Sequence, residues 1–237
     1  MAMKPLSLAV AAARVVLLSL GALLLPLGAP DRADGPIAAA RAQTAATAPA
    51  ATPAPEAGAR REGEDLVIGR ADAPVVVIEY ASLTCPACAR FHNDVLPRLK
   101  AEYVDPGHVK FVFRDFPLDR VAMQAAQIAR CVAPERYFGF VELLFRQQEQ
   151  WASGRDATVM IDRVKQYASL AGLPRDKATG CAEDQAAQLR IVTAAQIAEK
   201  EYRITGTPAL VINGKRHTGS PNFEDLDKAL RALLPKP

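Results

Sequence analysis

A short segment that leads from four consecutive β-branched residues into a pair of cysteines constrains this chain most strongly. The run at 75–78 (VVVI) follows Pro74, and its apolar, β-branched character indicates a strand buried on both faces. From Pro86 onward, apolar residues recur at three- and four-residue spacing, which is typical of a helix. Cys85 therefore lies at the junction of strand and helix, and Pro86 takes the first helical position, where a missing N–H is tolerated.

The rest of the chain extends this segment into an α/β fold. A turn at 105–107 ends the first helix, and Asn213-Gly214 has the composition preferred in a two-residue hairpin turn. Further strands are predicted at 109–116, 209–212 and 215–217, and further helices at 119–132, 134–151, 157–171, 176–185, 188–202 and 223–234. The order of these elements predicts a thioredoxin-like α/β fold with a helical insertion at about 118–188.

The N-terminal segment has the composition of a secretory signal. Lys4 and Arg14 precede a dense apolar run at 15–28, and the sequence ARA at 40–42 offers a cleavage site, so residues 1–42 are predicted to be a signal peptide. An uncleaved signal anchor is the alternative, because the apolar stretch can span a membrane if Arg14 extends its charge to the surface. We therefore expect export to the periplasm, with the uncleaved form anchored to the inner membrane.

The following segment, 43–63, is rich in Ala and Pro and poor in large apolar residues. It is predicted to be a disordered linker that precedes a folded domain at 64–237. The formal net charge of the chain is +3, and beyond residue 42 the balance is 25 basic to 24 acidic residues. A nucleic-acid partner would require a clustered basic face, so none is predicted.

Cys85 and Cys88 form a C-x-x-C pair whose position favours redox chemistry. The helix N-terminus carries partial positive charge and free N–H groups, which stabilise a thiolate at Cys85. Cys88 lies one turn further on, so Cys85 is predicted to attack and Cys88 to resolve the mixed disulfide. A zinc site is one alternative, but it would require a second paired ligand motif. A purely structural disulfide is the other, but its short loop would gain little chain entropy. Neither a metal nor a cofactor is predicted.

Two features elsewhere in the chain fit this chemistry. Glu79 is a carboxylate near the end of the apolar strand, and it is predicted to relay a proton to or from Cys88; a strand-end residue that reaches solvent is the alternative. Thr207-Pro208 leads into a predicted strand. A cis peptide bond there would turn the Thr207 backbone toward the thiols, where it could pair with an extended substrate peptide. A trans proline at a strand edge is equally compatible with the spacing.

The other cysteines and the aromatic residues are given structural roles. Cys131 and Cys181 are predicted to bond to each other in an oxidising compartment, and two free buried thiols are the alternative. His92 lies seven residues after Cys85 on a similar helix face and could tune its thiolate, but a surface histidine is the favoured interpretation. Trp151 is predicted to lie in the core.

Four features occur together in this chain. They are the C-P-x-C motif with a glutamate six positions earlier, the phrase FRDFPL at 113–118, the helical insertion that follows it, and G-T-P-A at 206–209. Over about 64–234, this combination resembles the DsbA-type thiol–disulfide oxidoreductases. The resemblance implies a thioredoxin fold, a cis peptide bond before Pro208, a nucleophilic Cys85 and a periplasmic role in oxidising secreted proteins.

Two positions depart from the best-known members of that family. The dipeptide between the cysteines is Pro86-Ala87, where those members have Pro-His, and Ala87 has no side-chain donor for the thiolate of Cys85. We therefore predict a less acidic Cys85 and a less oxidising pair than in those members. The residue before Pro208 is Thr207, which in related families also occurs in isomerases and reductases.

Together these features predict a periplasmic dithiol oxidase. Its substrates would be reduced, unfolded secreted proteins, and a membrane redox partner, most simply a quinone-linked protein, would reoxidise the cysteine pair. A disulfide reductase or isomerase kept reduced by a membrane electron donor is the alternative, although the linker offers no separate dimerisation domain. A tethered binding protein or chaperone on the same fold, or a glutathione-dependent transferase, would not require the intact C-x-x-C pair.

Overall fold

The computed structural model describes residues 60–62 and 64–234 of the 237-residue chain. The predicted signal segment, 1–42, and most of the predicted linker, 43–63, lie outside the described residues. Strand β1 (Arg60–Glu62) pairs with the next strand, so the sheet begins within the last residues of the segment predicted as linker. Within the described ranges, no helix is both long enough and apolar enough to cross a membrane.

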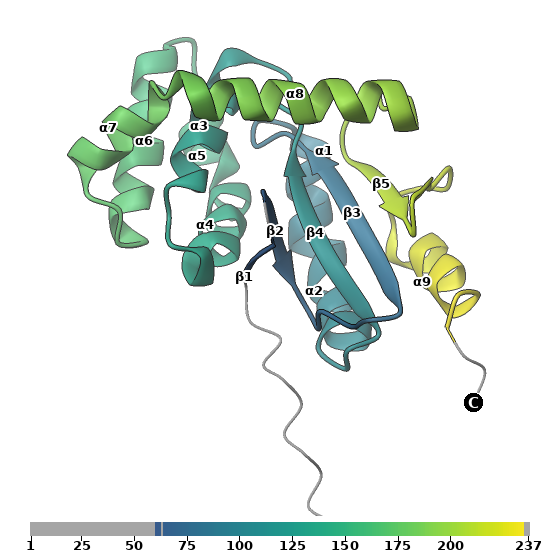
Figure 1. The fold of residues 1–237 in the computed structure, drawn as a ribbon. Helices are drawn as coiled ribbons and strands as arrows, with labels where there is room; N and C mark the ends of the chain where they lie inside the picture. Colours follow the sequence, from purple (N-terminus) through teal and green to yellow (C-terminus); the bar gives the residue numbers. More distant parts are fainter. Residues whose placement is uncertain (1–59, 63, 235–237) are drawn as a thin grey trace, which may run out of the picture. The chain divides into compact units, whose positions relative to one another are not determined.

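A mixed six-stranded sheet forms the centre of the described domain (Figure 1). Its strand order is β1-β2-β4-β3-β5-β6; β3 and β4 pair in parallel, and the other neighbours are antiparallel. The remaining strands are β2 (Asp65–Ile68), β3 (Val75–Ala81), β4 (Val109–Asp115), β5 (Ala209–Ile212) and β6 (Lys215–Arg216). The sequence did not predict β1 and β2; β1 lies within the segment assigned to the linker, and both strands are held by pairing with their neighbours in the sheet.

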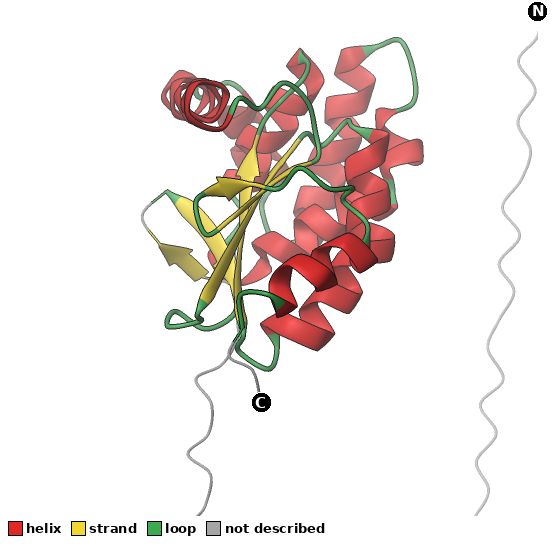
Figure 2. Cartoon of the chain, turned by 90° about the vertical axis from the view of Figure 1, so that its right-hand side faces the viewer, coloured by secondary structure: helices red, strands yellow, loops and turns green. Residues whose placement is uncertain are grey.

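Strand β3 lies between β4 and β5 and separates two parts of the core. Val75 and Val77 belong to the larger apolar cluster, whereas Tyr80 belongs to a smaller cluster that includes Ala198 of α8 (Gln185–Tyr202). Figure 2 shows α8 on one side of the sheet and most other helices on the opposite side. The prediction of a strand buried on both faces is confirmed. Because side chains alternate along a strand, Glu79 shares the face of Val77.

The helix that follows the cysteine pair continues to Val104, with two wider turns. It consists of α1 (Pro86–Arg90), the π-helical turn η1 (Phe91–Val95), α2 (Leu96–Leu99) and the π-helical turn η2 (Lys100–Val104). Pro97 has no N–H, so it cannot donate the regular helical hydrogen bond to the carbonyl four residues earlier. Just before it, the N–H of Leu96 donates to the carbonyl of Phe91, five residues earlier, which is the hydrogen bond of a π-helical turn. A π turn immediately before the proline thus accommodates it within a continuing helix.

The predicted insertion is a group of helices between β4 and α8. Its helices are α3 (Arg120–Arg130), α4 (Pro134–Arg146), α5 (Gln148–Ala152), α6 (Ala157–Leu170) and α7 (Arg175–Ala182). Asp119 caps α3 by accepting a hydrogen bond from the N–H of Ala122, which explains where the insertion begins. Trp151 is fully buried, as predicted, and its indole N–H donates to the carbonyl of Leu144.

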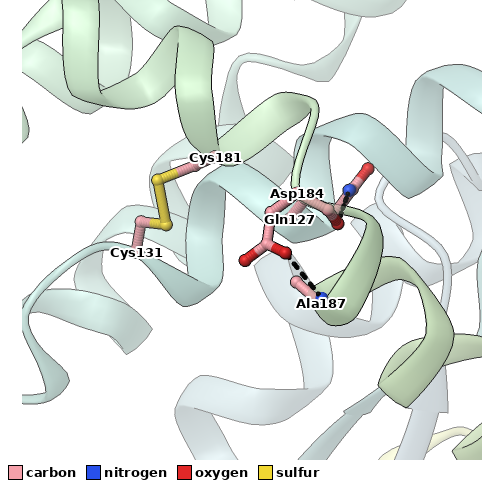
Figure 3. The surroundings of a disulfide bond; sticks show 5 residues. All are labelled: Gln127, Cys131, Cys181, Asp184 and Ala187. Atoms are coloured by element: carbon pink, nitrogen blue, oxygen red, sulfur yellow. Dashed lines mark hydrogen bonds between the residues drawn. A yellow bond between two sulfur atoms is a disulfide. The ribbon is translucent and has the colours of Figure 1, made fainter.

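A disulfide between Cys131 and Cys181 joins the end of α3 to α7 (Figure 3). The two Cα atoms are 6.4 Å apart, and 50 positions separate the residues in sequence. Close to this bond, the side chain of Gln127 donates to the carbonyl of Asp184, at 2.7 Å. The Asp184 carboxylate in turn accepts from the N–H of Ala187 in the first turn of α8. These contacts tie the insertion to the start of α8.

The chain closes with the β5–β6 hairpin and α9 (Phe223–Arg231). Asn213 and Gly214 both have positive φ, 46° and 75°, which agrees with the predicted type I′ turn. The Asn222 side chain accepts from the N–H of Asp225 and caps α9. The order of elements confirms the predicted thioredoxin-like α/β fold with a helical insertion.

Candidate active site

Cys85 is the N-cap residue of α1, directly after the loop that leaves β3. Its backbone is extended, with φ −78° and ψ 119°, and its carbonyl accepts the first helical hydrogen bond, from Ala89. Pro86 takes the first helical position, as the sequence predicted. This arrangement places the Cys85 sulfur beside the N–H groups of the first helical turn, and Cys88 follows one turn into the helix.

The environment shifts the pKa values of the two thiols in opposite directions. The Cys88 thiol, with smaller contributions from Thr207 and from the backbone N–H groups of Cys88 and Ala87, lowers the pKa of Cys85 to about 5, although burial opposes this shift. The Cys85 thiolate raises the pKa of Cys88, and burial and the charge of Glu79 raise it further. At neutral pH the reduced pair therefore holds a thiolate at Cys85 and a thiol at Cys88.

The Thr207-Pro208 segment lies against the thiols. The peptide bond between these residues is cis, and the Cys85 sulfur lies 3.4 Å from the carbonyl oxygen of Thr207, to which Cys85 donates when it is protonated. Strand β5 begins at the next residue and pairs with β3, with Leu210 opposite Glu79. Residues 122 positions apart in sequence thus meet because neighbouring strands carry them to the same edge of the sheet.

Glu79 is fully buried in the middle strand of the sheet. Its Oε2 atom lies 2.8 Å from Nε2 of His92, and both side chains have no exposed surface. The interpretation of Glu79 as a solvent-reaching strand end is therefore wrong in this structure. A buried carboxylate close enough to influence the pKa of Cys88 fits the predicted role in proton transfer.

The favoured interpretation of His92 as a surface histidine is wrong. Only 3% of the whole residue is exposed, none of it on the side chain, and the ring contacts Glu79 rather than Cys85. The sequence contained a signal for this position, because His92 follows the buried Cys88 by four residues and so shares its helix face. The seven-residue spacing from Cys85 does not reveal this shared face, whereas the four-residue spacing from Cys88 does.

Gln148 is a site residue that the sequence did not reveal. Its side-chain N–H₂ group donates to the carbonyls of Leu83 and Cys85, at 2.8 and 3.0 Å. Gln148 belongs to α5 of the insertion, so the insertion holds the backbone of the active-site loop in place. A second contact of the same kind joins Thr84 to Asp119, the N-cap of α3, at 2.5 Å.

The dipeptide between the cysteines forms a small, accessible surface. Pro86 is exposed and Ala87 is half-buried. The contribution of Ala87 to the Cys85 thiolate comes from its backbone N–H, since a methyl group has no donor. Within the described ranges, no group of three or more His, Cys, Asp or Glu side chains is arranged to hold a metal ion.

Two open grooves lie near the site, one along the Thr207-Pro208 segment and one connected to the loop before Cys85. One, of about 530 Å³, is lined by Thr207, Pro208 and the β5–β6 hairpin. The other, of about 500 Å³, is lined by residues 117–120, α3 and the start of α8, and the side chain of Leu118 on its rim is 52% exposed. The N–H of Leu118 donates to Ser82 in the loop before Cys85, which connects this groove to the active-site loop.

A family model and several solved structures of thiol–disulfide oxidoreductases resemble this chain. The family model described as "Thioredoxin" matches residues 61–232. The solved structure of Wolbachia pipientis alpha-DsbA1 superposes with a TM-score of 0.65 at 30% identity, over 73% of this chain and 92% of that one. The chain belongs to the DsbA-type proteins of the thioredoxin family. BdbD from Bacillus subtilis shares the DsbA-type fold, with a TM-score of 0.63 at 21% identity, over 70% of this chain and 91% of that one.

Curated relatives carry names of the same kind. A putative protein-disulfide oxidoreductase of Rickettsia prowazekii (strain Madrid E) is 27% identical over 73% of this chain and 62% of its own length. A probable disulfide bond formation protein D of Bacillus cereus is 26% identical over 71% of this chain and 78% of its own length. This DsbA-type chain thus spans about three fifths of the length of the rickettsial relatives that it matches.

Proposed function

We propose that this protein is a thiol–disulfide oxidoreductase that introduces disulfides into secreted proteins. The observation that carries the proposal is the opposite shift of the two thiol pKa values at the N-terminus of α1, beside the Thr207-Pro208 segment. A pKa of about 5 is far below the value of about 8.5 for a free cysteine, so Cys85 is a good leaving group and a ready nucleophile at neutral pH.

The proposed reaction begins with the oxidised Cys85–Cys88 pair. A substrate thiolate attacks the Cys85 sulfur, forms a mixed disulfide and releases Cys88 as a thiolate, which takes up a proton because its pKa is raised. A second substrate thiolate then attacks the substrate sulfur of the mixed disulfide and releases Cys85 as a stable thiolate. The substrate loses two electrons and gains a disulfide, while the Cys85–Cys88 pair gains both electrons.

A redox partner must then remove these two electrons. Cys85 attacks a disulfide of the partner, Cys88 loses its proton and attacks the Cys85 sulfur, and the partner leaves as a dithiol. We propose a membrane protein linked to quinone reduction as this partner, and the periplasm as the compartment. The basic and apolar N-terminal segment supports the proposed compartment.

The oxidase direction is favoured by the stabilised Cys85 thiolate. A low pKa of the nucleophilic cysteine favours the reduced form of the pair, which makes the disulfide a stronger oxidant. The groove along Thr207 and Pro208 and the groove at residues 117–120 are open to solvent, and they suit an extended, unfolded polypeptide better than a small enclosed ligand. An unfolded chain with free thiols is therefore the proposed substrate.

The test compares the oxidised protein with its Cys85→Ser and Cys88→Ser variants on a reduced, unfolded secreted protein. We expect the Cys85→Ser variant to form no substrate disulfide above the uncatalysed rate, and a reduced Cys88→Ser variant to form a stable mixed disulfide through Cys85 when offered an oxidised substrate. Substrate oxidation by the Cys85→Ser variant at the normal rate would refute the mechanism. Trapping the thiols in intact cells tests the direction, because a mostly reduced pair would favour a reductase or isomerase.

A further inference from the structure

The groove along Thr207 and Pro208 lies where the β5–β6 hairpin leaves part of a sheet edge uncovered. Strand β6 pairs with only the last two residues of β5, and one further backbone bond joins the N–H of His217 to the carbonyl of Leu210. Before Leu210, this edge has no strand neighbour on that side within the described part of the chain. An extended segment of a substrate can pair with such an edge.

The charge of this groove differs from that of the groove at residues 117–120. Among the described residues that line the groove along Thr207, Arg216 has a permanent charge and His217 is the other ionisable residue. The groove at residues 117–120 is instead lined by the charged side chains of Asp119, Arg120 and Glu183. It presents both signs, so a preference for one sign of charge in the substrate is expected at Arg216.

The alternation of side chains along β6 sends its two residues to opposite faces of the sheet. Arg216 lies opposite Val211, which belongs to the smaller apolar cluster, and Lys215 lies opposite Ile212, which belongs to the larger one. Nη1 of Arg216 donates to the carbonyl of Arg203, directly after α8, at 2.6 Å. Lys215 is exposed as well, but it does not line the groove.

The bond to a backbone carbonyl holds the Arg216 guanidinium without neutralising its charge. Arg114, Arg130 and Arg190 each form an ion pair with a carboxylate, whereas the described residues give Arg216 no such partner. A guanidinium has several N–H donors in one plane, so donors remain for a ligand after the bond to the carbonyl is made. Asp225 accepts from the N–H of Ser220 in the same loop and does not line the groove.

We propose that Arg216 is a specificity-determining residue that binds an acidic side chain of the substrate segment lying along Thr207 and Pro208. This inference rests on the proposed disulfide exchange, because that segment carries the cysteine that reacts with Cys85. A planar guanidinium with free donors can bind a carboxylate through two parallel hydrogen bonds. The ligand is thus an extended polypeptide with Asp or Glu close to its reactive cysteine.

Strand geometry gives the spacing between the acidic residue and the cysteine of the substrate. The carbonyl oxygen of Thr207 lies 3.4 Å from the Cys85 sulfur, and Arg216 lies opposite Val211, four positions after Thr207. An extended chain rises about 3.3 Å per residue, so up to about 13 Å separate these two levels. Because the arginine side chain itself bridges part of this distance, we expect the carboxylate about three positions from the cysteine.

The test measures the attack of Cys85 on two peptides that differ only in charge. The protein is the reduced Cys88→Ser variant, in which the mixed disulfide with Cys85 is not resolved. Each peptide has one cysteine that is disulfide-bonded to nitrothiobenzoate. The Cys85 thiolate attacks the peptide sulfur and forms a new disulfide, the bond to nitrothiobenzoate breaks, and nitrothiobenzoate leaves with the electron pair as a coloured thiolate.

The acidic peptide has Asp three positions before and three positions after its cysteine, with Gly between, and the neutral peptide has Asn at both places. The measured quantity is the rate constant for the acidic peptide divided by that for the neutral peptide, at about 0.1 M salt, where distant charges are screened. We expect this ratio to fall about two- to fivefold when Arg216→Gln is added, as for loss of one exposed ion pair.

Lys215→Gln is the matched control, because Lys215 is a neighbouring exposed cation on the opposite face of the same strand. It should leave the ratio unchanged. An unchanged ratio in the Arg216→Gln variant would overturn the proposal, and so would an equal fall in the Lys215→Gln variant, because that fall would reflect net charge alone.

A second measurement needs no substitution of Arg216. Raising the salt to about 1 M weakens the attraction between Arg216 and the peptide, so the ratio should fall. A constant or rising ratio would mean that repulsion between the peptide and the Cys85 thiolate dominates, and would also overturn the proposal. Failure of Cys85 to release nitrothiobenzoate from either peptide would instead refute the proposed exchange reaction, so the two failures are distinguishable.

Discussion

Both cysteine pairs of this chain can form a disulfide, but they lie in different environments, and one pair is reactive whereas the other is structural. Cys85 and Cys88 lie three positions apart at the start of α1, and their pKa values are shifted in opposite directions. Cys131 and Cys181 lie 50 positions apart and join α3 to α7 in a disulfide. A short pair at a helix N-terminus gains reactivity from its electrostatics, whereas a long-range pair gains stability from closing a loop.

Breaking the long-range pair should produce the largest change in stability. In the Cys131→Ser/Cys181→Ser variant, the chain-entropy model predicts a loss of roughly 4 kcal/mol in the free energy of unfolding, because a 50-residue loop is no longer closed. Urea denaturation of the oxidised proteins measures this loss. Disulfide exchange through Cys85 should continue at temperatures where the variant is folded, and its disappearance in the folded variant would contradict the division of roles.

The pH dependence of the reduced protein sharpens the comparison. Alkylation of Cys85 by iodoacetamide should follow a titration with a midpoint near the pKa of about 5, whereas the disulfide-bonded Cys131 and Cys181 should not react. Since the folded pKa of Cys85 is depressed, the resulting stability is fully present above the unfolded value of about 8.5 and is lost as the pH falls through about 5. A Cys85→Ser variant should lack this contribution, and an alkylation midpoint near 8.5 would contradict the prediction.

Gln148 links the insertion that holds the structural disulfide to the loop that holds the reactive pair. The Gln148→Leu variant leaves the carbonyls of Leu83 and Cys85 without this donor. We expect a loss of about 1–3 kcal/mol in the free energy of unfolding, together with slower exchange through Cys85. Thermal denaturation and an exchange assay measure the two effects. Gln166→Leu, at an exposed position of α6 in the insertion, is the control, and an equal loss in both variants would argue against a specific role for Gln148.

The smallest expected effect concerns the dipeptide of the reactive pair. The Ala87→His variant adds a side chain that can stabilise the Cys85 thiolate. Each further unit by which the pKa of Cys85 falls should make the couple about 30 mV more oxidising at a pH well above that pKa, where the reduced protein holds the thiolate. Redox titration against glutathione near pH 7 measures the shift. An unchanged or more reducing potential would show that the backbone N–H groups already provide all the stabilisation that the site can give.

Much of the reactive pair could be predicted from local sequence. The β-branched run at 75–78, the proline after Cys85 and the helical spacing that follows predict a strand, a turn and a helix, and the structure contains them. The order of the remaining elements predicts the insertion in the same way. These patterns depend on residues a few positions apart, which is the range over which periodicity and helix capping act.

The contacts that complete the site join residues far apart in sequence. Glu79 and His92 lie 13 positions apart on a strand and a helix, and Gln148 lies 63 positions from the Cys85 carbonyl that it binds. No local pattern distinguishes His92 from a surface histidine or Gln148 from other polar residues of the insertion. The short strands β1 and β2 likewise take their structure from pairing with neighbours.

The sequence by itself therefore determined where the reactive cysteines lie and which backbone elements hold them, because these follow from short-range steric and hydrogen-bonding preferences. The tertiary structure alone decided that a buried histidine pairs with Glu79 and that a glutamine of the insertion holds the Cys85 loop. The physical reason is that a buried polar group must find its partner wherever packing brings one within hydrogen-bond distance, and packing is a property of the whole fold.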